Sequence, residues 1–343
     1  MMKRIKTKYI LLFELALVLF LGAKVGIWLS DNKIPNFEGS ADIYVYPDTT
    51  PEEVMAQLDS QLVIKRHRSL ARVMKDKRVD EFIQAGHYVV EDGNTSVYVA
   101  RMLNNCWQTP VNLVLSGTMR RKGDIARKIA NQMMTDSASV MSALCDQQLL
   151  SKYGFDTVNV FSLLMPDTYQ MYWTATPEEI LDRQKEAYDA FWTEERLDKA
   201  KAQGLTRKEV SILASIVKGE TNYEPEMSMI AGVYLNRLHK GMKLQADPTI
   251  AFCYDYNVNR ILKRNLEVDS PYNTYKYAGL PPGPIYVPTK ACLDAVLNPE
   301  GKNLFFCADP SFNGSHRFAT TYPEHLKNAR AFQRALNQRQ NAK

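Results

Sequence analysis

The chain has 343 residues, of which 45% are hydrophobic and 24% charged, and this balance excludes a mainly disordered protein. Lys and Arg exceed Asp and Glu by only five, and the excess is scattered, so no basic stripe for a nucleic-acid partner is present. The length is sufficient for a full hydrophobic core in two or three domains.

A long apolar stretch follows a basic N-terminus. Residues 1–8 read MMKRIKTK, and ILLFELALVLFLGAKVGIWL then runs from Ile10 to Leu29. About 20 apolar residues can cross a bilayer as a helix, and basic flanks stay on the cytoplasmic side. We therefore predict a cytoplasmic basic segment at 1–8 and a transmembrane anchor at 9–29. The alternative is a cleaved signal peptide with its apolar region at 10–23, although Leu21 does not suit a small-residue cleavage site.

Three segments after the apolar stretch share a strand-then-helix pattern. The strand-like stretches are ADIYVY at 41–46, AGHYVVE at 85–91 and VNLVLS at 111–116. Helices are expected within 47–58, 91–103 and 116–133, where apolar residues recur at i and i+4. This pattern predicts a small α+β region at 40–135.

Two capping boxes mark helix starts in the second half of the chain. Thr176 is followed by Pro177 and Glu179, and Thr206 is followed by Glu209. Beyond residue 240 the sequence is rich in Pro, Gly, Tyr and Asn, as in LQADPTIAF, which predicts loops and short strands.

Five cysteines are present, and none lies in a CxxC pair or at the spacing of a metal site. An odd number leaves at least one free thiol, so disulfides do not organise the fold. We expect most of these cysteines to be buried as small hydrophobic residues, and we predict no metal site.

Glu220 interrupts the pattern of the helix expected at 207–221. On a helical wheel it falls within the apolar arc, one heptad after Leu213. The opposite face carries Lys208, Ser211, Ser215 and Lys218. A carboxyl group on an apolar face has a raised pKa and can hold a proton near neutral pH, as a general acid must. The alternative is that Glu220 marks the helix end, which the preceding Gly219 would favour by weakening the helix, and that its side chain reaches solvent or pairs with an arginine.

Three ordered motifs carry a family resemblance: LASIVKGET, IAGVYLNRLHKGMKLQADPTI and YNTYKYAGLPPGPI. They resemble the YceG-like (MltG) family of endolytic murein transglycosylases over about 160–325, with MPDTY at 165–169 and HRF at 316–318 as outlying matches. The resemblance implies an α+β fold with an N-terminal transmembrane helix, a LysM-like peptidoglycan-binding region at 40–135 and a mixed α+β catalytic domain at 150–335.

The resemblance also implies a reaction. Such an enzyme cleaves the β-1,4 bond between N-acetylmuramic acid (MurNAc) and N-acetylglucosamine (GlcNAc) within nascent strands, leaves 1,6-anhydroMurNAc ends, ends glycan elongation and needs no cofactor. Glu220 would protonate the leaving oxygen and then accept a proton from the muramic acid 6-hydroxyl. The family usually has a second glutamate two residues earlier, as in IVEKET, and here that position is Lys218.

Nine further positions match the motifs and offer chemistry suited to sugars. Asp247 is the best candidate for a second carboxylate. Arg237 could pair with a carboxylate of the site or of a stem peptide, or form a structural salt bridge. YNTY is either a sugar-binding segment or an aromatic corner of the core, and His316 is more typical of a structural role. The predicted substrate-binding residues are Asn236, Arg237, Gln245, Asp247, Thr249, Tyr272, Asn273, Thr274 and Tyr275.

The implied partners are peptidoglycan glycan strands, the inner (cytoplasmic) membrane through a single-pass helix and, from the family alone, peptidoglycan synthases. The catalytic domain is then periplasmic. One rival hypothesis is a membrane-anchored peptidoglycan-binding protein whose site has decayed, as Lys218 would suggest. Another is a lysozyme-type hydrolase, whose product is heavier by one water than an anhydro end.

Overall fold

The computed structural model describes the backbone of residues 2–341 and the side chains of residues 8–339. The chain divides into two compact units, here called unit 1 (1–112 with 170–175) and unit 2 (113–169 with 176–343). Most of the predicted basic segment 1–8 lies outside the described side chains. The ranges predicted for the LysM-like region and the catalytic domain stay predictions.

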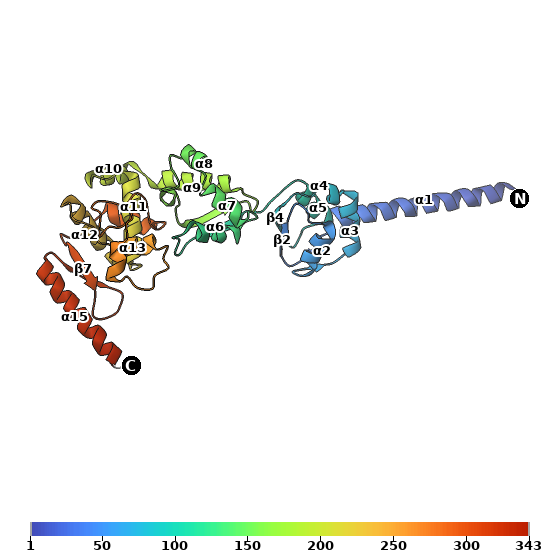
Figure 1. Ribbon diagram of the computed structural model, residues 1–343. Coiled ribbons are helices and arrows are strands. Elements are labelled where there is room, and N and C mark those ends of the chain that lie inside the picture. Colours follow the sequence, from blue (N-terminus) through green and yellow to red (C-terminus); the bar gives the residue numbers. More distant parts are fainter. Residues whose placement is uncertain (1, 342–343) are drawn as a thin grey trace. The chain divides into compact units, whose positions relative to one another are not determined.

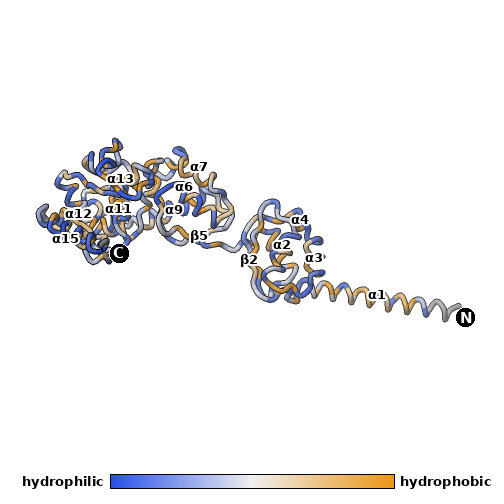
Figure 2. Tube along the Cα trace, turned by 60° about the horizontal axis from the view of Figure 1, so that its bottom comes forward, coloured by the Kyte–Doolittle hydropathy of each residue, from blue (hydrophilic) through white to orange (hydrophobic). Residues whose placement is uncertain are grey.

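Helix α1 (Met2–Asn32) is the apolar N-terminal helix (Figure 1). Within Lys8–Asn32 an 18-residue window has a mean hydropathy of 2.3, and none of it is buried. Figure 2 shows this apolar character along most of the helix. Its length and hydropathy fit a single membrane span.

Unit 1 surrounds an apolar core with four short helices and two small antiparallel sheets. β2 (Ala41–Val45) pairs with β4 (Gly86–Val90), which confirms two of the predicted strands, and Ile43 lies opposite Tyr88. Alternate residues of β2 are buried, as expected for a strand with one face on a core. The other elements are β1 (Phe37–Glu38), β3 (Val63–Ile64), α2 (Pro51–Asp59), α3 (His67–Asp76), α4 (Val79–Phe82) and α5 (Ser96–Asn104).

The first part of unit 2 includes most of the third predicted strand, β5 (Val111–Leu115), which pairs with β6 (Asp167–Met171). The predicted capping box at Thr176 is confirmed: its Oγ1 accepts a hydrogen bond from the Glu179 amide at 3.2 Å, and α9 (Pro177–Phe191) follows. The remaining helices here are α6 (Lys122–Ala130), α7 (Ser137–Ala143), α8 (Gln147–Lys152), η1 (Val160–Ser162) and α10 (Glu194–Ala202).

The second part of unit 2 is arranged around α11 (Arg207–Glu220). This helix contacts α12 (Met227–His239), α13 (Asp247–Cys253) and α14 (Lys290–Leu297). A hairpin of β7 (Phe305–Ala308) and β8 (His316–Ala319) then leads to α15 (Tyr322–Asn341). The short helices η2 (Glu224–Glu226) and η3 (Lys263–Glu267) complete the unit, so the fold is mixed α+β with small sheets.

Three expectations were wrong in detail. Ser211 and Ser215 are fully buried rather than on a polar face, because α11 is surrounded by other helices and small side chains allow their close approach. LQADPTIAF is not only loop: Asp247 and Pro248 begin α13, since proline is tolerated in the first turn of a helix. Of the five cysteines, all of them unpaired, only Cys292 is buried.

Candidate active site

Glu220 is the last residue of α11, and the helix brings it to the site from a buried core. The predicted capping box of Thr206 and Glu209 starts the helix, and every residue from Val210 to Val217 is buried. The chain leaves the helix in an extended conformation at Thr221. Glu220 therefore lies at the end of a rigid element. Its predicted place on an apolar helix face agrees with the buried residues that precede it in α11.

Tyr234 of α12 is the direct partner of Glu220. Its hydroxyl donates a hydrogen bond to Oε1 of Glu220 at 2.5 Å. The tyrosine is only 1% exposed, and its ring packs edge-on against Phe306 with the centroids 5.9 Å apart. The packing of α12 and β7 thus fixes the orientation of the carboxyl group.

The environment of Glu220 favours its protonated form. Desolvation raises the pKa of Glu220 to about 7, and the nearby Asp247 carboxylate also raises it, while the Tyr234 hydrogen bond and the charge of Arg237 oppose the shift. Part of the side chain remains accessible from the cavity described next. A carboxyl group with this pKa carries a proton for a substantial part of the time at neutral pH, which general-acid catalysis requires.

A cavity of about 260 Å³ opens beside Glu220. Asp247 lines it as well, and its carboxylate accepts a hydrogen bond from the hydroxyl of Tyr275 at 2.6 Å. Two carboxyl groups with different surroundings therefore face one space. The other walls combine aromatic rings with cations, and they include Tyr256, Tyr286, Arg120 and Arg260.

Gly219 allows α11 and α13 to meet at the cavity. A Cβ atom at this position would lie 2.5 Å from Cβ of Pro248 and 3.1 Å from Cε2 of Tyr286. The glycine is therefore a packing requirement of the site. The helix continues through Gly219 and ends at Glu220, so this part of the alternative, with Glu220 at the helix end, agrees with the structure.

Comparison with known proteins places the chain in a family. A family model described as "YceG-like family" matches residues 43–331, most of the chain. The chain belongs to the YceG-like family.

Several members of known name or structure are similar to this YceG-like chain. An endolytic murein transglycosylase of Bacillus subtilis (strain 168) is 28% identical over 281 residues, which cover 77% of each protein. A protein of the same name from Streptococcus pneumoniae serotype 2 (strain D39) is 30% identical over 171 residues, or 48% of this chain and 31% of that protein. A crystal structure of a yceG-like protein of Listeria monocytogenes superposes with a TM-score of 0.57 at 26% identity and covers 84% of this chain and 98% of that one.

The structure brings three of the residues expected in this YceG-like site together: Glu220 and Asp247 line the cavity, and Tyr275 holds Asp247. Gln245 lies two residues before Asp247, is exposed and has a left-handed φ of 52°. Tyr272 lies against Phe252 with ring centroids 4.4 Å apart, as an aromatic corner would. Their roles in binding substrate stay predictions.

Other predicted site residues make internal contacts. Thr249, Thr274 and Asn273 are buried: the two threonine hydroxyls are 2.9 Å apart, and the Asn273 amide donates to the carbonyls of Leu266 and Val268, both at 2.8 Å. Buried amides and hydroxyls in such contacts hold a loop in one conformation.

On α12, the two predicted polar residues also bond to backbone. Asn236 donates to the carbonyl of Asn303 at 3.0 Å. Arg237 is 8% exposed and donates to the carbonyls of Leu304 and Leu244, both at 2.6 Å. No carboxylate of the described side chains pairs with Arg237, and its pairing with a stem-peptide acid stays a prediction.

His316 of the HRF motif joins β8 to η2. Its backbone amide lies 3.0 Å from each carboxylate oxygen of Glu226, and its Nδ1 lies 2.8 Å from Glu226 Oε2. Both side chains are largely buried, and His316 does not line the cavity. The structure thus gives His316 the structural position that was expected for it.

Sequence reasoning did not find Tyr234, Arg120, Tyr256 or Tyr286. Tyr234 lies inside the motif IAGVYLNRL, so the one signal for it was a polar tip on an otherwise apolar helix face. Arg120 stacks on Tyr256, with its guanidinium 4.4 Å from the ring centroid. It lies a hundred residues before Glu220 in the chain, and no local pattern connects the two.

Proposed function

We propose that this protein is a lytic transglycosylase that cleaves the MurNAc-β-1,4-GlcNAc bond inside peptidoglycan glycan strands. The observation that carries the proposal is Glu220, a carboxyl group with a pKa of about 7 that faces a cavity large enough for part of a sugar chain. Membership of the YceG-like family and the names of the relatives support a peptidoglycan substrate.

In this mechanism Glu220 performs both proton transfers. It first donates its proton to the glycosidic oxygen, and the bond from that oxygen to C1 of MurNAc breaks. The resulting carboxylate then removes the proton from the 6-hydroxyl of the same MurNAc, while O6 forms a bond to C1. The products are a GlcNAc hydroxyl end and a 1,6-anhydroMurNAc end. Glu220 regains its proton, and no water is consumed.

Asp247 has a supporting electrostatic role in this scheme. Its carboxylate is held by the Tyr275 hydroxyl and faces the same cavity as Glu220. A fixed negative charge near C1 stabilises the positive charge that develops there as the bond breaks. The Asp247 charge also raises the pKa of Glu220 and so favours the protonated form of the acid.

The presence of two carboxyl groups at one cavity also supports a second candidate function, a lysozyme-type hydrolase. In that enzyme the second carboxylate acts on water or on the sugar carbon. Both reactions use Glu220 as acid and differ in the product. A water molecule is added in hydrolysis and not in the formation of an anhydro end.

We further propose that α1 anchors the protein in the inner membrane with both units in the periplasm, where nascent strands would be cut and elongation ended. Residues 40–135 would then be the LysM-like glycan-binding region and 150–335 the catalytic domain. Helix α1 supports the anchor by its length and hydropathy. A partnership with peptidoglycan synthases rests on the family resemblance.

The test is Glu220→Gln assayed on purified glycan strands with products identified by mass. We expect anhydro-ended products to fall by about 10²-fold to 10⁴-fold, because glutamine cannot donate the proton. Glu267→Gln, at an exposed position of η3, is the matched control and should leave activity unchanged. Anhydro products at the wild-type rate from Glu220→Gln would refute the assignment. Wild-type products heavier by one water would favour the hydrolase, and a wild type that binds glycan without cutting it would favour a decayed site.

A further inference from the structure

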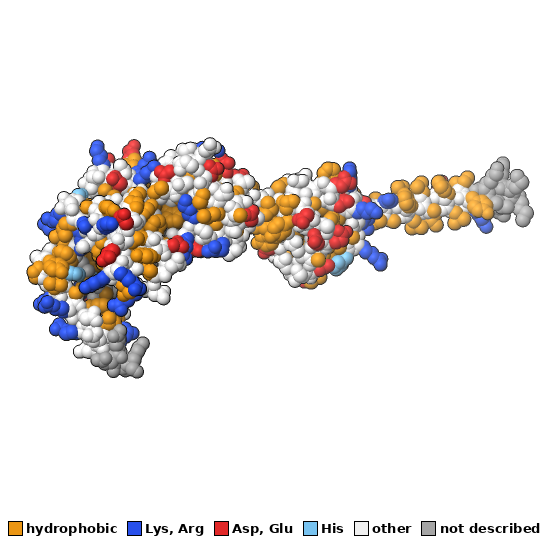
Figure 3. All heavy atoms as spheres, viewed as in Figure 1, with side chains coloured by type: hydrophobic (Ala, Val, Ile, Leu, Met, Phe, Trp, Pro, Cys, Tyr) orange, Lys and Arg blue, Asp and Glu red, His pale blue; other side chains and the backbone are white. Residues whose placement is uncertain are grey.

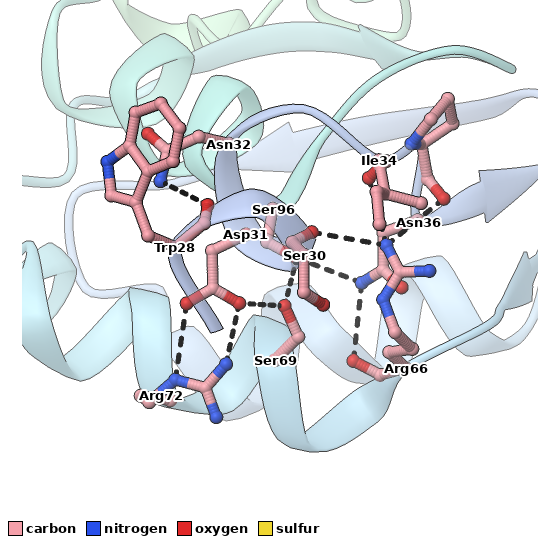
Figure 4. Close-up of polar contacts among 11 residues, drawn as sticks. Trp28, Ser30, Asp31, Asn32, Ile34, Asn36, Arg66, Ser69, Arg72 and Ser96 are labelled. Carbon is pink, nitrogen blue, oxygen red and sulfur yellow. Dashed lines mark hydrogen bonds and ion pairs between the residues drawn. The ribbon is translucent and has the colours of Figure 1, made fainter. Parts of the chain in front are cut away.

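The end of helix α1 is joined to the rest of unit 1 by a network of polar contacts (Figure 4). Asp31 is 6% exposed and accepts hydrogen bonds from Ser69 Oγ at 2.5 Å and from Arg72 Nη2 at 2.6 Å and Nε at 3.2 Å. Ser69 and Arg72 belong to α3. The apolar helix therefore ends in a fixed joint with α3 rather than in a loose tether.

Arg66 extends this joint to the chain that leaves α1. Its Nη2 lies within hydrogen-bonding distance of three carbonyl oxygens, those of Ser30 at 3.3 Å, Ile34 at 2.9 Å and Pro35 at 3.2 Å. The side-chain amide of Asn36 donates to Ser96 Oγ at 2.9 Å. These contacts set the position of the start of α3 relative to the helix.

The joint lies at a defined depth if α1 spans the membrane, as proposed above. Residues Ile10 to Trp28 of a helix cover about 27 Å, close to the roughly 30 Å of a hydrocarbon core. Trp28 is 53% exposed, as suits a tryptophan at the membrane interface. Ser30 and the N-terminus of α3 then lie at the depth of the phospholipid headgroups.

An open pocket of about 570 Å³ occupies this position. One wall is an apolar face of α1 formed by Ala23, Gly26 and Ile27, and a Cβ atom on Gly26 would meet nothing within 4 Å. The other wall is formed by Arg66, His67, Arg68 and Arg72, and its three arginines are cations. Figure 3 shows Lys and Arg side chains gathered where α1 enters the rest of unit 1.

Arg68 is the cation of this pocket that is available to a ligand. It is exposed, and it makes no side-chain hydrogen bond or ion pair with the described part of the chain. Arg72 is paired with Asp31, and His67 with Asp59 at 2.7 Å. The wall therefore keeps a positive excess directly beside an apolar groove, a combination that matches a phosphate group attached to an acyl chain.

We propose that this pocket binds an anionic phospholipid of the membrane. Its headgroup phosphate lies against Arg68 and the outer edges of Arg66 and Arg72, and its first acyl carbons follow the groove at Ala23 and Gly26. This inference depends on the proposed membrane anchor and not on the proposed catalytic chemistry. Bound lipid would hold unit 1 against the membrane surface in one orientation.

The test uses full-length protein reconstituted in nanodiscs of phosphatidylcholine with a minor fraction of phosphatidylglycerol. Native mass spectrometry of the released protein measures how strongly phosphatidylglycerol is enriched among the retained lipids. Arg68→Gln should lower the enrichment about 5-fold, since a basic residue near an anionic surface contributes on the order of 1 kcal/mol. Lys77→Gln removes one positive charge from the opposite end of α3 and should change the phosphatidylglycerol enrichment less than about 2-fold.

A second pair of variants tests the groove without changing charge. Gly26→Leu fills the space beside Arg68 and should lower the enrichment, whereas Gly22→Leu, one turn earlier and outside the pocket, should not. Equal losses of phosphatidylglycerol enrichment within either pair of variants would mean a general attraction to the bilayer and would refute the proposed lipid site. So would displacement of the lipid by inorganic phosphate alone, since the ligand would then be a free anion. Gly26→Leu lies in α1, outside the proposed glycan-binding region, and its glycan cleavage is expected to be unchanged, so a failure here is separate from a failure of the catalytic proposal.

Discussion

Replacement of Tyr234 by phenylalanine should make Glu220 a weaker acid. The tyrosine hydroxyl donates to Glu220 at 2.5 Å, and this hydrogen bond lowers the pKa of Glu220 against the desolvation that raises it to about 7. Phenylalanine keeps the ring that packs against Phe306 and removes only the donor. The variant therefore tests one contribution to the pKa with little change in packing.

The size of the effect follows from the charge of the acceptor. A hydrogen bond to an ionised group contributes about 1.5–3 kcal/mol, and one pKa unit corresponds to about 1.36 kcal/mol. The pKa of Glu220 should thus rise by about 1–2 units in the variant. The free enzyme needs protonated Glu220, so its activity is lost as the pH rises through that pKa. The alkaline limb of kcat/KM should move upward by the same amount, while the maximum falls because the weaker acid transfers its proton less readily.

The assay is the pH profile of kcat/KM for anhydro product formation on purified glycan strands. Tyr169→Phe is the matched control, because Tyr169 is also buried in unit 2 and its hydroxyl donates to the carbonyl of Met165. That variant should leave the alkaline limb in place. An unmoved limb in Tyr234→Phe, or one displaced to lower pH, would show that the Tyr234 hydrogen bond does not set the pKa of the catalytic acid.

Three further variants test the site. Glu220→Gln should stabilise unit 2 by about 3 kcal/mol above pH 7 and should not stabilise it below pH 4.5, because the folded state binds the Glu220 proton more tightly than the unfolded state does. Thermal unfolding measured at a series of pH values tests this. A difference in stability that does not change with pH would contradict it. Gly219→Ala should lower kcat/KM about 10-fold to 100-fold and lower the free energy of unfolding by about 1–3 kcal/mol, since the new Cβ atom meets Pro248. Wild-type kinetics in this variant would refute the packing argument. Arg120→Gln should lower kcat/KM about 5-fold on strands with acidic stem peptides but not on glycan from which the stem peptides have been removed, and Arg120→Lys should recover part of the lost kcat/KM. Equal losses on both substrates would argue against binding of a stem-peptide carboxylate by Arg120.

Local patterns in the sequence predicted the starts of elements well. The capping boxes at Thr176 and Thr206 begin helices where expected, since each needs only a hydroxyl and a glutamate three residues apart. The strands β2, β4 and β5 also lie where the apolar stretches indicated. In each case the signal and its physical cause are within one short segment.

Features that depend on distant segments were not predictable in this way. Ser215 looked like a surface residue because a helical wheel does not show that other helices surround α11. Its hydroxyl accepts a hydrogen bond from the amide of Ile285, seventy residues later in the chain. Likewise, Gly219 suggested a weak helix, and only the position of Pro248 shows that it serves close packing.

The placement of Arg237 explains how a buried cation can lie near Glu220 without removing its proton. Had its guanidinium formed an ion pair with Glu220, the pKa of Glu220 would have been lower, and the carboxyl group would be ionised for more of the time at neutral pH. Instead the two carbonyls of Leu304 and Leu244 accept its hydrogen bonds, so its charge only opposes the larger effect of desolvation. The helix α12 thus supplies both Tyr234, which holds the acid in place, and an arginine whose direction leaves that acid protonated.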